Sequence, residues 1–364
     1  MPSPEPPTTA AAAPTRAHAQ RWCELLDGVV SLLPVTAASV LVDGDNASPA
    51  AFAARLAAAL DEGGRPCVRL DGASGANASP RSVGARGTFI ELAGGTRWRD
   101  ARDWDIVIWL RTAPGGVNSG VNGGVNGLTG DGRERREREA RADIVIDLHD
   151  ADWPVIRRVA ARLAAGGAWY LTETRAFFAC RAATWDTKFG DDQPAYAAAI
   201  SEAGLRRGGV ALDIGCGSGR ALAPLRQAVG PEGCVIALDL TPEMLAVARP
   251  AGITARAALV LADARLLPFA DASADAIFAA GLVNHLPDAT AGLRELARVT
   301  RGGGLLMLFH PSGRAALAAR HGRDLSPDEP LAEGMLRRST AASGWKLTVY
   351  DDAPHRFFAL AERC

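Results

Sequence analysis

Residues 210–219 constrain the fold more than any other part of this sequence. They read Val-Ala-Leu-Asp-Ile-Gly-Cys-Gly-Ser-Gly, so an apolar run gives way to alternating glycines, and a helical pattern follows. Such apolar side chains are typical of a buried parallel strand, while glycines allow positive φ angles and let a ligand lie against bare backbone. The stretch therefore predicts a strand, a tight turn and a helix start that can hold a nucleotide-like ligand.

The glycine turn departs from the dinucleotide-binding fingerprint. That fingerprint, Gly-x-Gly-x-x-Gly, needs a small residue where Arg220 stands. No lysine lies between Val210 and Arg220. The glycines therefore serve close approach of a ligand, not binding of an anion.

Acidic residues mark the ends of three apolar runs. Asp213, Asp239 and Asp263 each lie at such an end, and a fourth apolar run covers residues 275–281. Asp239 lies about 20 residues beyond the glycine turn, where such sheets place an acid that accepts hydrogen bonds from ribose hydroxyls. One such acid alone is better explained as a solvated cap or turn residue, but three at successive strand ends indicate a ligand site.

These motifs, in this order, resemble the class I S-adenosylmethionine-dependent methyltransferases, in particular the small-molecule branch that includes the quinone-biosynthesis enzymes. The resemblance is dense over residues 205–310. The segments that carry it are Asp213-Ile-Gly-Cys-Gly-Ser-Gly219, Asp239-Leu-Thr-Pro-Glu-Met-Leu-Ala-Val-Ala-Arg249, Ala262-Asp-Ala-Arg-Leu-Leu-Pro-Phe269, His285-Leu-Pro-Asp288 and Glu295-Leu-Ala-Arg-Val-Thr-Arg-Gly-Gly-Gly304. One departure is Arg301-Gly302, where the family usually has Lys-Pro; it affects a turn and not the cofactor.

The resemblance implies an α/β fold and a cofactor. The fold is a seven-stranded Rossmann-like sheet with one antiparallel edge strand, completed by a fifth parallel strand at 305–309 and a hairpin of 345–350 and 357–361. The cofactor is S-adenosylmethionine, with the glycine turn lining its methionine part, Asp239 holding the ribose and Asp263 the adenine. The cofactor-binding residues implied are Asp213, Gly215, Cys216, Gly217, Gly219, Asp239, Leu240, Asp263, Ala264 and Ala280.

Methyl transfer from a sulfonium needs little besides alignment. It is an in-line displacement that dissipates positive charge, so holding the acceptor in a dry pocket can supply much of the acceleration. A general base is optional. His285 is the catalytic candidate and His310 the second, because both follow strands at the edge where open α/β sheets bind ligands. A structural histidine is the competing interpretation for each.

Two further segments are candidates for the acceptor side. Residues 169–189 are rich in aromatics, and in similar methyltransferases a helix there covers the cofactor. Core packing is the competing interpretation for each single aromatic; as a group we expect them to line the pocket. The aromatics concerned are Tyr170, Phe178, Trp185 and Phe189. Arg314 and His321, after the fifth strand, are candidates for recognising an acidic or phenolic acceptor.

Residues 21–164 read as a second, separate α/β domain. Strands are expected at 38–44, 67–71, 87–92, 104–110 and 142–147, and helices at 50–60 and 153–164. The Val-Asp-Gly before the first turn, the Trp-Asp-Ile-Val-Ile-Trp-Leu strand and the late Ala-Asp-Ile-Val-Ile-Asp resemble the uridine kinase-like nucleoside kinases.

The phosphate loop of this kinase-like domain is degenerate. Counted from Gly44, the residues Pro49, Ala50 and Ala51 stand where the loop needs glycine, lysine and a hydroxyl. The loop thus lacks a backbone donor, the cation for the phosphates and the magnesium ligand. The domain is either a retired kinase kept for nucleoside binding, docking or regulation, or a scaffold needed for solubility or dimer contacts.

Length and composition set the outer bounds. A chain of 364 residues suggests two or three domains: a disordered tail rich in Pro, Ala and Thr at 1–20, the kinase-like domain at 21–164 and the methyltransferase domain at 165–364. A Gly-Val-Asn repeat at 115–127 reads as a flexible loop. The net charge of −1 supplies no basic field, so neither nucleic acid nor a membrane is expected as a partner.

Six cysteines without a Cys-x-x-Cys pair indicate no metal site and no disulfide framework. The sequence shows no membrane span and no signal peptide, so a cytoplasmic location is predicted. The predicted function is S-adenosylmethionine-dependent methyl transfer to a small molecule in a closed pocket. The sequence leaves the oligomeric state undetermined, with a homodimer as one candidate. The alternatives are a cofactor-binding regulator or scaffold without turnover and, least favoured, a nucleoside kinase.

Overall fold

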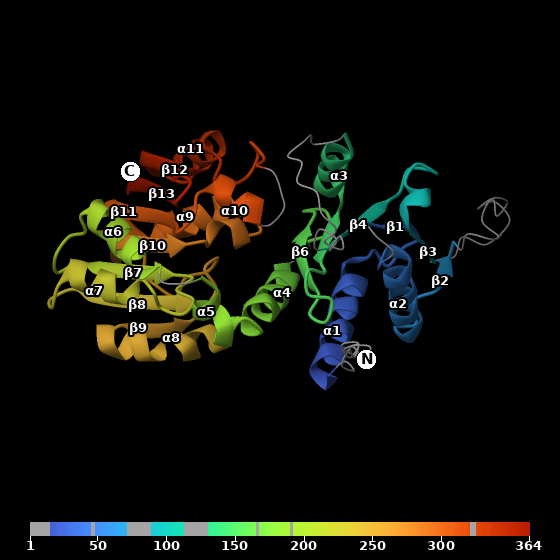
Figure 1. Ribbon diagram of the computed structural model, residues 1–364, viewed down its shortest axis with the longest axis horizontal. Coiled ribbons are helices and arrows are strands. Elements are labelled where there is room, and N and C mark those ends of the chain that lie inside the picture. Colours follow the sequence, from blue (N-terminus) through green and yellow to red (C-terminus); the bar gives the residue numbers. More distant parts are fainter. Residues whose placement is uncertain are drawn as a thin grey trace, which may run out of the picture. The chain divides into compact units, whose positions relative to one another are not determined.

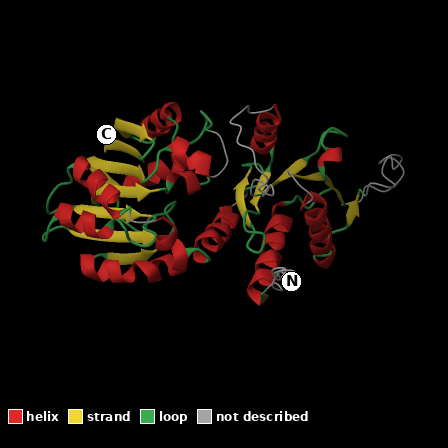
Figure 2. Ribbon diagram, in the orientation of Figure 1, coloured by secondary structure: helices red, strands yellow, loops and turns green. Residues whose placement is uncertain are grey.

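The computed structural model describes residues 15–44, 48–70, 89–112, 130–164, 167–189, 192–320 and 325–364. The chain divides into two compact units, Met1–Trp169 and Tyr170–Cys364, and each has a sheet of its own (Figures 1 and 2). The sequence places this boundary before residue 165. The second unit begins five residues later, inside helix α4 (Ala168–Ala179).

The first unit is built on a six-stranded sheet with the order β2-β3-β1-β4-β5-β6. Strands β1 to β5 are parallel, and β6 runs antiparallel to β5. Its elements are α1 (Arg16–Leu32), β1 (Ala38–Gly44), α2 (Ser48–Glu62), β2 (Cys67–Arg69), β3 (Ile90–Gly94), η1 (Thr96–Trp98), β4 (Ile106–Arg111), α3 (Gly130–Arg141), β5 (Ile144–Asp147) and β6 (Val155–Val159).

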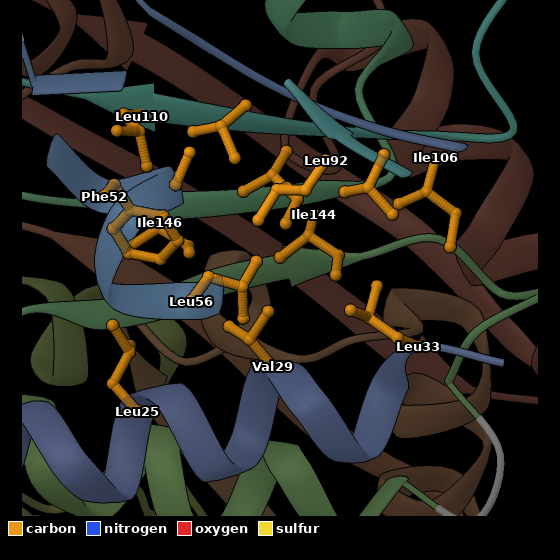
Figure 3. Packing of buried hydrophobic residues seen from close by; sticks show 14 of the residues in the cluster. Leu25, Val29, Leu33, Phe52, Leu56, Leu92, Ile106, Leu110, Ile144 and Ile146 are labelled. Carbon is orange, nitrogen blue, oxygen red and sulfur yellow. The ribbon is translucent and has the colours of Figure 1, made fainter. Parts of the chain in front are cut away.

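Helices α1 and α2 cover one face of this sheet, as Figure 3 shows. Leu25 and Val29 of α1 and Leu56 of α2 are fully buried in one apolar cluster with Ile144 and other strand residues. Strand side chains alternate between the two faces, so a smaller cluster around Trp109 forms on the opposite face. The first unit thus has a core of its own.

Two segments of the first unit differ from the prediction. Helix α1 begins at Arg16, inside the predicted tail, because the Thr15 hydroxyl accepts from the His18 amide and the His18 ring accepts from the Thr15 amide. The closing helix predicted at 153–164 is wrong. Residues 155–159 form β6, because their β-branched side chains suit a strand and they pair with β5. The Gly-Val-Asn repeat lies outside the described residues.

The second unit has a seven-stranded sheet, as predicted, with the order β12-β13-β11-β10-β7-β8-β9. Strand β13 is antiparallel to both neighbours, so the antiparallel strand lies one place in from the edge strand β12. The elements are α4, η3 (Ala182–Thr184), α5 (Trp185–Phe189), α6 (Gln193–Ala203), β7 (Val210–Ile214), α7 (Leu222–Val229), β8 (Cys234–Asp239), α8 (Pro242–Ala255), β9 (Ala258–Leu261), β10 (Ala274–Ala280), η4 (Val283–His285), α9 (Ala289–Val299), β11 (Thr300–His310), α10 (Arg314–Arg320), α11 (Glu333–Ala342), β12 (Trp345–Ala353) and β13 (Arg356–Arg363).

The core of this second sheet is aromatic where α6 crosses it. Tyr196 of α6 packs with its ring centroid 4.8 Å from that of Phe309 and 5.8 Å from that of Phe278. At the opposite edge from the glycine turn, Asp275 accepts from the Val210 amide and pairs with Arg301 at 2.8 Å. The departure at Arg301 therefore has a structural role: it helps to fix the start of β7.

Candidate functional site

The glycine turn lies where the strand order of the second sheet reverses. From β7 the chain moves outward through β8 and β9, and then returns to place β10 on the other side of β7. Open α/β sheets bind ligands at the carboxyl ends of the strands at such a point. A ligand site is therefore expected at the turn after β7.

Hydrogen bonds to β8 shape this turn. The amides of Gly215 and Cys216 donate to the carbonyl of Leu238 at 2.8 and 3.0 Å, and the Gly217 amide donates to Asp239 Oδ2 at 2.9 Å. Gly217 has a φ of 52°, and a Cβ added there would meet no atom within 4 Å. A ligand can thus lie directly against the backbone at Gly217.

Two acidic residues, Asp213 and Asp239, are buried beside the turn, close enough for the charge of Asp239 to affect Asp213. Asp213 is 1% exposed, and its Oδ2 has no hydrogen-bond partner within the described part of the protein. Burial, with the neighbouring Asp239 charge second, raises the pKa of Asp213 to about 8. Burial also raises the pKa of Asp239, although the carboxylate accepts from the Thr241 amide at 2.8 Å. A buried carboxylate without a donor is costly, so this pair fits a ligand that brings positive charge or hydrogen-bond donors.

Asp263, the third predicted acid, has a partner in the protein. Its carboxylate pairs with Arg265 at 2.8 Å, and the Arg265 guanidinium lies 4.4 Å from the centroid of the Tyr170 ring. Burial raises the pKa of Tyr170 to about 12, with the charge of Asp263 as the next cause. Helix α4 also contacts the end of β8, because Arg175 Nε donates to the Leu240 carbonyl at 3.1 Å. Helix α4 therefore lies beside the carboxyl ends of β8 and β9.

The remaining predicted cofactor residues belong to the same edge of the sheet. Cys216 is buried, and burial raises the pKa of its thiol well above the usual value. Gly219 closes the turn with a φ of 86°, Ala264 follows β9 and is buried, and Ala280 ends β10. The ten predicted residues thus lie at the carboxyl ends of four neighbouring strands, while their individual roles stay predictions.

His285 belongs to an aromatic cluster, which we define as Phe177, Phe178, Trp185 and His285. The His285 ring centroid lies 5.0 Å from that of Phe178 and 6.0 Å from that of Phe177. Trp185 of α5 extends the cluster, 5.6 Å from Phe178. The structure therefore brings the catalytic candidate together with two of the predicted aromatics.

The other acceptor-side candidates differ in their surroundings. His310 Nδ1 lies 2.9 Å from the Ser312 carbonyl oxygen and 3.1 Å from the Ser312 amide nitrogen. Arg314 pairs with Glu329 at 3.1 Å and Asp352 at 3.5 Å, so two carboxylates of the protein already balance its charge. His321 and the side chain of Phe189 lie outside the described residues.

Sequence reasoning missed three hydrogen bonds that Ser218 and Arg220 make at the end of the glycine turn. Ser218 Oγ donates to Asp186 Oδ1 at 2.6 Å, and Arg220 Nε donates to the same oxygen at 3.0 Å. Arg220 Nη1 also donates to Asp192 at 2.7 Å. The available signal was Arg220 itself, the residue that breaks the dinucleotide fingerprint, and the Trp185-Asp186 pair upstream.

The equivalent edge of the first sheet carries ion pairs. Arg99 Nε donates to both oxygens of Asp43, at 2.8 and 2.7 Å, and Arg111 pairs with Glu139. Pro49, Ala50 and Ala51 lie in the first turns of α2, while residues 45–47 of the predicted phosphate loop are outside the described part. The two arginines are thus paired with acids of the protein itself.

The described residues contain no group of three or more His, Cys, Asp or Glu side chains placed to hold a metal ion. They also contain no helix that is both long and apolar enough to cross a membrane.

Comparison with known proteins assigns the central part of the second unit. Residues 212–308 match the family described as "Methyltransferase domain". Demethylmenaquinone methyltransferase from Staphylococcus aureus is 34% identical over 114 residues, which cover 31% of this chain and 47% of that protein. The match therefore spans less than half the length of these relatives.

Two solved structures are also similar to this chain. An S-adenosylmethionine-dependent methyltransferase from Aquifex aeolicus is 23% identical with a TM-score of 0.40, over 48% of this chain and 90% of its own. Magnesium protoporphyrin IX methyltransferase from Synechocystis PCC 6803, with bound S-adenosylhomocysteine, is 17% identical with a TM-score of 0.43, over 53% of this chain and 99% of its own.

Proposed function

We propose that this chain, whose residues 212–308 match the family described as "Methyltransferase domain", transfers the methyl group of S-adenosylmethionine to a small-molecule acceptor. The observation that carries the proposal is Oδ2 of Asp213, which is buried and has no hydrogen-bond partner among the described residues, beside an open glycine turn. S-adenosylmethionine brings a cationic amino group and a sulfonium, which are the charges that this site lacks.

The residues around the turn have distinct parts in this proposal. Asp213 receives a cationic group of the methionine part, the bare backbone at Gly217 lets that part approach, and Asp239 accepts hydrogen bonds from the ribose. Asp239 is already held by the amides of Gly217 and Thr241, so its carboxylate is fixed before the cofactor arrives. Such preorganisation lowers the entropy cost of binding. The cofactor itself supplies the activated methyl group.

We propose a small, planar and largely apolar acceptor. The aromatic cluster offers ring faces and edges against which a flat ring can stack. The Staphylococcus relative is named for a quinone substrate, which agrees with such an acceptor. The cluster would align the ring and exclude water, and alignment is the main requirement of a sulfonium displacement.

The test supplies the full chain with methyl-labelled S-adenosylmethionine in a cell extract. We expect S-adenosylhomocysteine to accumulate and the label to enter an extractable small molecule. The Asp239→Ala variant is the control and should transfer far less label. Cofactor that binds but is never converted would instead support a regulator or scaffold without turnover.

His285→Ala is expected to separate binding from chemistry. If His285 acts as a general base, turnover should fall about 100-fold or more, since positioned bases contribute about that much. Cofactor affinity should stay within about twofold, because the predicted cofactor residues are unchanged. His355→Ala, in the exposed turn between β12 and β13, is the matched control and should keep turnover. Unchanged turnover of His285→Ala at saturating acceptor would remove the base and leave alignment alone as the mechanism.

We propose that the first unit has no phosphoryl-transfer activity. Its sequence from Met1 to Trp169 contains no lysine. At the carboxyl ends of its strands, Arg99 pairs with Asp43 and Arg111 pairs with Glu139. Loss of preorganised charge from such a site costs orders of magnitude in rate. The full chain with ATP, magnesium and a panel of nucleosides should therefore release ADP no faster than a mock preparation. Sustained release that scales with the amount of protein would overturn this.

A further inference from the structure

We infer that Ser218, Arg220 and Asp186 form a latch that holds a lid over the cofactor site. The lid is defined as residues 182–189, which comprise η3 and α5. This inference rests on the proposed function, because it assigns these residues the task of controlling cofactor exchange and aligning the acceptor. They are positioning residues, since they act through the lid.

The latch joins the glycine turn directly to the lid. Asp186 Oδ1 accepts from Ser218 Oγ at 2.6 Å and from Arg220 Nε at 3.0 Å. Arg220 also donates to the Asp186 carbonyl at 3.4 Å and pairs with Asp192, at the start of α6, at 2.7 Å. One arginine of the turn thus binds both the lid and the helix that follows it.

The two donors of the latch, Ser218 and Arg220, are buried, whereas its acceptor Asp186 is exposed. The side chain of Arg220 is 9% exposed and Ser218 is 7% exposed, whereas the Asp186 side chain is 54% exposed. If Asp186 leaves, two buried donors lose an acceptor that water replaces only partly. The Asp186 carboxylate itself loses little free energy when the lid opens, because it is already half exposed and water can hydrogen-bond to it. The hydrogen bonds that the buried Ser218 and Arg220 donate to Asp186 therefore hold the lid closed.

The lid carries the end of the aromatic cluster. Trp185 precedes Asp186, and its ring contacts Phe178, which contacts His285. A change at the glycine turn can thus reach the proposed acceptor side through Asp186 and Trp185. We place the coupling between cofactor binding and acceptor alignment in this chain of contacts.

The experiment measures lid opening in the full chain with and without S-adenosylhomocysteine. Hydrogen exchange reports the backbone amides of 182–189, and stopped flow reports dissociation of S-adenosylhomocysteine. Asp186→Ala should speed both about tenfold or more, because it removes the hydrogen bonds that Ser218 and Arg220 donate to a charged group. The melting temperature should fall slightly, because Ser218 and Arg220 lose an acceptor, while Arg220 keeps its bond to Asp192 and the fold stays intact.

Two variants serve as controls. Asp186→Asn keeps an oxygen that can accept from Ser218 and should give intermediate rates. Thr187→Ala removes an exposed hydroxyl of the lid that donates to the Thr184 carbonyl and is not part of the latch, so it should behave as the wild type. Exchange at 182–189 that is unchanged in Asp186→Ala would overturn the latch, and faster exchange with unchanged dissociation would overturn its control of cofactor release. A wild type that binds no S-adenosylhomocysteine would instead refute the proposed function, while the exchange measurement still tests the latch.

Discussion

Replacing Asp239 by alanine is expected to weaken binding of S-adenosylmethionine at least tenfold. In our proposal the ribose hydroxyls lose their charged acceptor, and each such hydrogen bond is worth about 1.5 to 3 kcal/mol. The same change frees the amides of Gly217 and Thr241, so the turn itself should also loosen. Titration calorimetry of the full chain measures the loss.

A surface acid provides the control for this variant. Asp271→Ala removes the same charge from a side chain that is 79% exposed and pairs with Arg298, and it should leave cofactor affinity unchanged. Asp239→Ala that binds the cofactor as tightly as the wild type would show that the ribose assignment is wrong.

Asp213→Asn is expected to weaken cofactor binding and to stabilise the empty protein. The amide cannot offer a full negative charge to a cationic group of the cofactor, so affinity should fall about tenfold or more. The amide is neutral at every pH, whereas the buried Asp213 carboxyl costs folding energy either as an ion or by taking up a proton above its ordinary pKa. Affinity and melting temperature should therefore change in opposite directions.

The pH dependence of this stabilisation follows from the raised pKa of Asp213. The pKa of Asp213 is about 8 in the folded protein and about 3.9 when unfolded. The folded state thus binds the proton more tightly, and the wild type loses stability as pH rises from about 4 to about 8. Asparagine does not titrate, so the gap in melting temperature should widen from pH 6 to pH 8. A gap that is constant or narrows over this range would contradict a raised pKa.

The second unit was predictable because its sequence signals are local. An apolar run followed by glycines fixes a strand and a turn, and the terminal hairpin is fixed by two short apolar runs around Asp351 and Asp352. The position of the antiparallel strand β13 inside the sheet was not predictable, because strand order depends on long-range pairing with β11.

The misses have similar physical reasons. Residues 155–159 carry β-branched side chains that suit a strand, but the strand also needs β5 as a pairing partner, and no local pattern in the short segment reveals that pairing. The latch between Asp186 and Arg220 joins residues 34 apart in the sequence, so no local pattern reveals it. The partners of Arg314 were missed likewise, because Glu329 and Asp352 reach it from other parts of the chain.

Titration of the full chain with S-adenosylmethionine and with S-adenosylhomocysteine tests the central claim most directly. The account predicts saturable binding of each at one site per chain, with Asp213→Asn and Asp239→Ala both weaker than the wild type. No saturable binding at about 1 mM cofactor, the upper end of ordinary KM values, would contradict it.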